Sequence, residues 1–239
     1  MISLVDRIVS DFRLIKRDGI LLVGILAPIF IAFLFRVGFS HVAEIAYQLA
    51  GLNLYNHLQL IMGVTLLMTP SMLGMMAGFM LLDDRDEGLL TYFAVTPLKR
   101  IGYIRYRIMV TFILSLFLFY VVVSLSDLLE LSWWVNFPLS ILYALEAPIF
   151  ALLLALFANN KVEGLALNKV LSVSIIVPII AYFVPEGWEW LFMLVPTFWP
   201  VWTLLFAGTF DFWLYLIGGM ILHIMIILFL INMFLRKTE

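Results

Sequence analysis

Carboxylate side chains gather in one polar stretch of an otherwise apolar sequence. Asp83, Asp84 and Glu87 lie close together in it. Carboxylates at this spacing could hold Mg²⁺ and the diphosphate of a lipid-linked substrate, because oxygen ligands suit this hard cation. Such a site needs further carboxylates, and the other polar loop expected on the same side, 159–164, offers only Glu163. We therefore predict no metal site and keep a metal-dependent membrane enzyme acting on lipid-linked substrates as an alternative hypothesis.

Two further ionisable residues lie in apolar surroundings. Glu146 stands just before Pro148 in a long apolar run. A charged carboxylate at mid-membrane costs about 2.5–3.5 kcal/mol, so Glu146 is expected to face the protein interior or to be protonated. It either lines a substrate pathway or dimer seam, or it is a neutral, hydrogen-bonded packing residue. For His223 a structural role is favoured. An ion-coupled secondary transporter with Glu146 as its proton site is a second alternative hypothesis.

The composition is that of an integral membrane protein. Of the 239 residues, 64% are hydrophobic and 13% are charged, and the mean hydropathy is +1.11, whereas a soluble domain carries about 25% charged residues. The sequence has no cysteine, which excludes disulfides and thiolate metal sites. It also lacks the G-x-x-x-x-G-K-[ST] phosphate-binding motif, so we expect no enzyme activity and no ATP hydrolysis by this chain.

The hydrophobic pattern predicts an all-α membrane protein that forms a single domain over residues 1–239. Each span is judged against the roughly 20 residues that are needed to cross the hydrocarbon layer. The predicted spans are 20–40, 58–82, 104–125, 134–158, 165–184 and 212–235. Before them, apolar residues recur at helical spacing within 1–18, with basic and polar residues between them, which predicts an amphipathic helix lying in the membrane interface.

The apolar segment 191–207 could be read as a seventh span, but it contains Pro196 and Pro200. With six spans, nearly all basic residues fall on one side of the membrane, and the positive-inside rule makes that side the cytoplasm. We therefore predict that both termini and the loop 83–100 are cytoplasmic, and that 185–211 is an extracytoplasmic re-entrant region. The seven tryptophans all fall on the predicted outer side, as interfacial anchors would.

The loop 83–100 also carries a family resemblance. The runs Glu87-Gly88-Leu89-Leu90 and Val95-Thr96-Pro97-Leu98 resemble the first cytoplasmic loop of type-2 ABC exporter permeases, with Leu89 where that family usually has threonine. A second segment, 157–169, resembles the loop that precedes the fifth span in the same family. The order and spacing of these motifs agree over nearly the whole chain. The sequence is thus similar to the membrane subunit of a drug- or antibiotic-exporting ABC transporter.

The resemblance implies a permease that forms the translocation pathway as a dimer, with a second identical or similar permease, and that couples to a separate ABC ATPase. A short cytoplasmic coupling helix, residues 84–96, would lay its apolar face into a groove on the ATPase. The implied coupling residues are Asp86, Glu87, Gly88, Leu89, Tyr92, Phe93, Thr96 and Pro97. ATP and Mg²⁺ would bind at the partner ATPase, with no cofactor on this chain. We expect the cell membrane as location, membrane lipid and a hydrophobic or amphipathic substrate as partners, and no nucleic acid.

Overall fold

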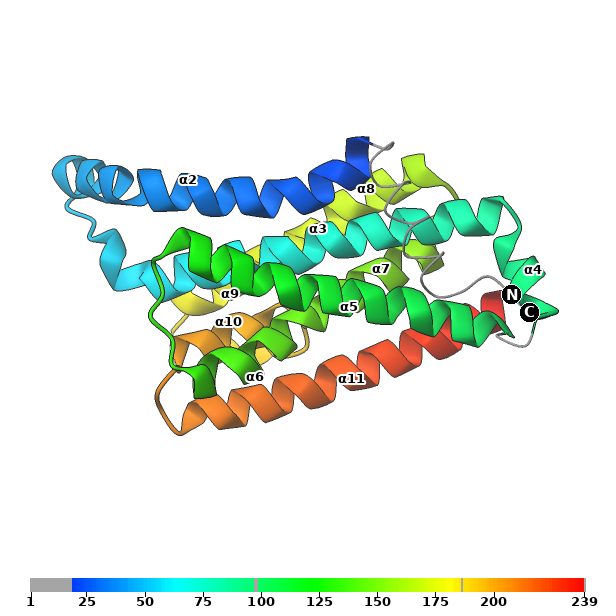
Figure 1. Cartoon of the computed structure of the whole chain (residues 1–239). Helices are drawn as coiled ribbons and strands as arrows, with labels where there is room; N and C mark the ends of the chain where they lie inside the picture. Colours follow the sequence, from blue (N-terminus) through cyan, green and yellow to red (C-terminus); the bar gives the residue numbers. More distant parts are fainter. Residues whose placement is uncertain (1–18, 97–98, 186, 239) are drawn as a thin grey trace.

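The chain folds into an elongated bundle of helices (Figure 1). The structure, a computed structural model, describes residues 19–96, 99–185 and 187–238. No strand occurs in these ranges. The elements in chain order are α2 (Gly19–Ala50), η1 (Leu54–His57), α3 (Leu58–Asp86), α4 (Leu89–Ala94), α5 (Lys99–Ser126), α6 (Trp133–Ala144), α7 (Glu146–Phe157), α8 (Lys161–Ser172), η2 (Val173–Ile176), α9 (Val177–Phe183), η3 (Glu189–Phe192), α10 (Phe198–Leu205) and α11 (Asp211–Thr238).

Six helical segments are long and apolar enough to cross a membrane, which confirms the predicted number of spans. They are unequally buried within the chain. About three quarters of the most apolar windows of the spans containing α3 and α6–α7 are buried (72% and 83%), against 17–33% for the other four. The second and fourth spans therefore form the centre of the bundle, and the other spans leave large apolar faces on its outside.

The central pair packs through small residues on α3. A Cβ atom added at Gly74 would lie 2.5 Å from the Cβ of Phe150 and 2.6 Å from the carbonyl oxygen of Ala147, and one at Gly78 would lie 2.8 Å from the Cβ of Leu154. No side chain fits at such distances, so the glycines allow α3 and α7 to approach closely. This contact is the most extensive between any two of the described helices.

Prolines explain where two of the spans depart from the predicted continuous helices. The fourth span is interrupted at Leu145, between α6 and α7. Pro148 has no N–H, so the carbonyl of Ala144 loses its usual helical partner there. The fifth span consists of α8, η2 and α9, with Pro178 in the first turn of α9. The carbonyl of Ser174, which Pro178 leaves without its helical donor, accepts the Val177 N–H and the Thr197 hydroxyl at 2.6 Å.

The first span and the segment before the sixth span also differ in detail from the prediction. Helix α2 has 32 residues and continues to Ala50 rather than ending at residue 40, which gives it a length of about 48 Å. Helix α10 has only eight residues and is too short to cross a membrane, and its side chains Phe198 and Val201 are fully buried. Whether 185–211 re-enters the bilayer stays a prediction, and the predicted interfacial helix, 1–18, lies outside the described residues.

The close contact of α3 with α7 makes a specific prediction about glycine. Replacing Gly74 with alanine forces the two helices apart and is expected to lower the free energy of unfolding by about 1–3 kcal/mol. Gly38→Ala is the matched control, since a Cβ at Gly38 meets nothing within 4 Å. Thermal unfolding of the purified proteins in detergent measures the difference. Equal melting temperatures for the two variants would contradict the packing described here.

Candidate functional site

The polar stretch 83–96, between the second and third spans, forms a corner at one end of the bundle (Figure 1). In this corner the end of α3, a tight turn and the short helix α4 follow one another. Helix α3 continues through Asp86, and Glu87 caps it, with its N–H bonded to the carbonyl of Asp83 at 2.8 Å. Gly88 then adopts a left-handed conformation, with φ of +72°, which favours glycine because it has no Cβ. The predicted coupling helix 84–96 is therefore wrong in its bounds: residues 84–86 belong to α3, and α4 is only six residues long.

The predicted coupling residues fall into two sets according to their exposure. The inner set is Leu89 and Phe93, and the outer set is Asp86, Glu87, Gly88 and Tyr92. The Phe93 ring is buried and stacks on Tyr103 of α5, with centroids 4.6 Å apart, and Leu89 packs against the same cluster. Tyr92 is 57% exposed, and Asp86, Glu87 and Gly88 are exposed as well. Phe93 therefore anchors α4 to α5, and the side chains of the outer set are left exposed on the surface of the corner.

The two residues that follow α4 close its last turn. Val95 caps the helix and is 86% exposed. The Thr96 hydroxyl donates a hydrogen bond to the carbonyl of Phe93 at 2.9 Å. Pro97 lies outside the described residues. The exposed surface of the corner thus combines acidic side chains at its start with the apolar side chains of Tyr92 and Val95.

A buried polar cluster behind α4 was not predicted from the sequence. The Asp84 carboxylate accepts hydrogen bonds from the Tyr103 hydroxyl and from Nη2 of Arg107 at 2.8 Å. The side chains of Asp84 and Arg107 are 9% and 8% exposed. A signal was present in the sequence, since Tyr103 and Arg107 are one helical turn apart and share a face of α5. This cluster joins the end of α3 to the start of α5.

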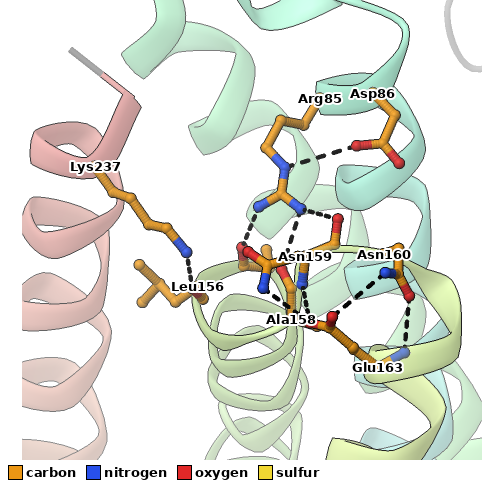
Figure 2. A network of polar contacts seen from close by, with 9 residues as sticks. Arg85, Asp86, Leu156, Ala158, Asn159, Asn160, Glu163 and Lys237 are labelled. Carbon is orange, nitrogen blue, oxygen red and sulfur yellow. Dashed lines mark hydrogen bonds and ion pairs between the residues drawn. The ribbon is translucent and has the colours of Figure 1, made fainter.

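Arg85 joins the same corner to the centre of the bundle (Figure 2). Its guanidinium donates hydrogen bonds to the carbonyls of Ala155, Ala158 and Asn159 at 3.3, 3.1 and 2.8 Å. Lys237, near the end of α11, donates to the carbonyl of Leu156 at 2.5 Å. The last carbonyls of a helix lack intrahelical hydrogen-bond donors and carry partial negative charge. Arg85 and Lys237 supply both hydrogen-bond donors and positive charge at this end of α7.

The second segment that carried the family resemblance lies against the first. Asn160 caps α8 by accepting the Glu163 N–H at 2.9 Å, and the Glu163 carboxylate accepts the Asn159 N–H at 2.9 Å, as Figure 2 shows. Lys161 forms an ion pair of 2.9 Å with Asp83. The segments 83–88 and 157–163, far apart in the sequence, are therefore joined in one polar network.

These contacts bear on the alternative of a metal-dependent enzyme. Asp83 pairs with Lys161, Asp84 pairs with Arg107, and Glu163 caps α8. Within the described ranges, no group of three or more histidine, aspartate or glutamate side chains is arranged to hold a metal ion. Asp83 and Asp84, two of the three carboxylates that suggested a metal site, are paired with basic side chains that hold the corner together.

Glu146 and His223 meet inside the bundle, and their side chains are 1% and 0% exposed. Nδ1 of His223 lies 2.6 Å from the carbonyl oxygen of Gly219, which can only accept, so Nδ1 carries a proton. Nε2 lies 3.1 Å from the Glu146 carboxyl group, and a single proton between them satisfies both. The pair has no net charge whichever atom holds the proton. These contacts fit the hydrogen-bonded packing alternative. A place for Glu146 in a substrate pathway or dimer seam stays a prediction.

Six apolar spans with this corner at one end (Figure 1) agree with the sequence resemblance to the membrane subunit of an ABC exporter. A family model described as Fluoroquinolones export permease protein Rv2686c-like matches residues 11–231, and the chain belongs to this family. Two relatives from Mycobacterium tuberculosis are named Fluoroquinolones export permease protein MT2760 (strain CDC 1551 / Oshkosh) and Rv2686c (strain ATCC 25618 / H37Rv). Each is 28% identical over 238 residues, covering 95% of this chain and 92% of the relative. No solved structure matches the chain.

The buried pair of Asp84 and Arg107 makes a prediction about stability. Asp84→Asn removes the carboxylate that pairs with the buried Arg107 guanidinium, so the free energy of unfolding is expected to fall by about 3–5 kcal/mol. The exposed neighbour Asp86 is the control. It lies 3.9 Å from Arg85, and Asp86→Asn is expected to change stability by less than about 1 kcal/mol. Thermal unfolding compares the two variants. Equal melting temperatures for Asp84→Asn and Asp86→Asn would contradict a stabilising buried pair of Asp84 and Arg107.

Proposed function

We propose that this chain is the permease subunit of an ATP-driven exporter and that the corner around α4 couples it to a separate ATPase. The observation that carries the proposal is the division of the corner into an anchored inner side and an exposed outer side. Tyr92 and Val95 supply exposed apolar area, and Asp86 and Glu87 flank it with negative charge. This combination fits a groove on a partner protein, where apolar contacts give affinity and charges fix the register.

The contacts behind α4 support a role in transmitting force. The stacked rings of Phe93 and Tyr103 tie α4 to α5, and the Asp84–Arg107 pair ties α3 to α5. Arg85 ties the same corner to the end of α7. A push on α4 by a closing ATPase would therefore displace three spans together, because packed helices move as units rather than deforming continuously.

A groove on the outside of the central helix supports a dimeric pathway. Val64, Met68, Met72 and Met75 form one stripe along α3, and the opposite wall comes from the fifth span, including Ile175 and Ile179. The groove holds about 380 Å³. Methionine side chains adapt to varied apolar partners. We place a second permease copy over this groove, so that the two copies enclose a pathway for a hydrophobic or amphipathic substrate.

The remaining parts of the proposal concern orientation, substrate and ligands. Lys237 and the corner around α4 lie at the same end of the bundle, and the basic residues make this end cytoplasmic by the positive-inside rule. Both termini would then be cytoplasmic. ATP and Mg²⁺ would bind to the partner ATPase. The names of the two mycobacterial relatives suggest fluoroquinolone-like antibiotics as the first substrates to test.

Reversing the charge of Glu87 tests the proposed docking surface. Glu87→Arg is expected to reduce co-purification of the cognate ATPase and to lower export at least about tenfold, because it puts a repulsive charge in the contact. Tyr92→Ala is expected to act in the same direction by removing apolar contact. Pull-down with the ATPase and drug efflux from cells measure the two effects, and thermal unfolding is expected to stay unchanged because both side chains are exposed.

The matched control is Glu44→Arg, the same charge reversal on α2. Glu44 is exposed and accepts a hydrogen bond from Gln48. The Glu44→Arg variant is expected to keep both its complex with the ATPase and its export activity. Undiminished export by the Glu87→Arg variant would remove the corner from the coupling role, and equal losses in both variants would show a general effect of added positive charge.

A further inference from the structure

A second hollow lies at the end of the bundle opposite α4, where no motif and no relative's name assigns a role. It holds about 630 Å³, a size typical of small-molecule sites. Its walls come from η1 and the start of α3, from α9, η3 and α10, and from the first turns of α11. Six elements from two distant parts of the sequence, 55–60 and 181–215, thus converge on one cavity.

Aromatic rings form much of the wall. The lining includes Tyr55, Tyr182, Trp202, Phe206 and Tyr215. Several of these rings are fixed by their neighbours: Phe206 stacks on Tyr215 with centroids 5.0 Å apart, and Trp202 stacks on Phe198 at 4.4 Å. Rings that are already ordered lose little freedom when a ligand binds. The faces of such rings attract cations as well as apolar groups.

The charge in the cavity has one sign. Glu189 is the formally charged residue among the described lining residues, and no lysine or arginine accompanies it there. Its Oε2 accepts the N–H of Gly187 at 2.7 Å, which orients the carboxylate. Its Oε1 has no hydrogen-bond partner within the described ranges. His57, which also lines the cavity, shares a hydrogen bond of 3.0 Å with the Tyr182 hydroxyl.

From this arrangement we infer that the cavity binds organic cations, with Glu189 as the counter-charge and the tyrosine rings as the apolar and cation–π surface. An oriented carboxylate beside aromatic faces recognises an ammonium or phosphonium group on an apolar body, and it disfavours anions. The inference rests on the proposed export function and narrows its substrate class. Glu189 and Tyr55 are the binding residues assigned here, and neither contacts the corner around α4.

The test measures direct binding of tetraphenylphosphonium, a permanent organic cation, to the whole chain in lipid nanodiscs. Equilibrium dialysis against empty nanodiscs subtracts partition into lipid. The wild-type chain is expected to bind the cation saturably, and Glu189→Gln is expected to raise Kd about tenfold, because the amide keeps the shape and removes the charge. The control is Asp211→Asn, an exposed acid in the first turn of α11 that does not line the cavity, and it is expected to leave Kd unchanged.

A second pair of variants separates ring and hydroxyl contributions at Tyr55, which is 55% exposed. Tyr55→Phe keeps the aromatic face and is expected to keep affinity, whereas Tyr55→Leu is expected to raise Kd several-fold. The inference is overturned if the wild type shows no saturable binding, if Glu189→Gln binds like wild type, or if Asp211→Asn loses as much affinity as Glu189→Gln. The binding assay contains no ATPase, so its result does not depend on whether the coupling proposal is correct. Conversely, a Glu189→Gln variant that still docks the ATPase would show that the loss of cation binding is separate from coupling.

Discussion

The close contact between α3 and α7 is the constraint on which the rest of the structure depends. Gly74 and Gly78 bring the two backbones together, and this contact places the second and fourth spans at the centre of the bundle. Both spans end at the same side, so the polar residues that follow them meet. The network of Arg85, Lys161 and Glu163 exists because the glycines set the distance between these two helix ends.

The polar groups at the two ends of α7 are satisfied by hydrogen bonds and by opposite charges. Helix α7 has Glu146 bonded to His223 at its start and two cations on the carbonyls at its end. In an apolar surrounding an unpaired group of this kind would cost several kcal/mol. The same contacts make α7 the span to which α3 and α11 are attached by polar side chains. In the coupling that we propose, these contacts give a movement of the corner around α4 a route to the centre of the bundle through Arg85.

The sequence predicted the number of spans and the membrane class well, because runs of apolar residues are set by the thickness of the bilayer. It predicted helix ends less well. The resemblance implies that Asp84–Asp86 belong to a separate coupling helix, but they continue α3 and are held there by Tyr103, Arg107 and α7. The pairing of Glu146 with His223 could not be predicted, since 77 residues separate them and no spacing rule links two different spans. Phe93 was expected to face a partner, but its ring stacks on Tyr103, a contact made only in three dimensions.

The most direct measurement of the central claim is export and ATP hydrolysis by the complex carrying Arg85→Met. Methionine keeps an apolar stem and removes the three hydrogen bonds to the carbonyls of Ala155, Ala158 and Asn159. Arg85 lies behind the exposed surface, so the ATPase is expected to bind and hydrolyse ATP as before, while export per ATP falls at least about tenfold. Export per ATP at the wild-type level would show that the corner does not act on the bundle through Arg85, and it would contradict the account.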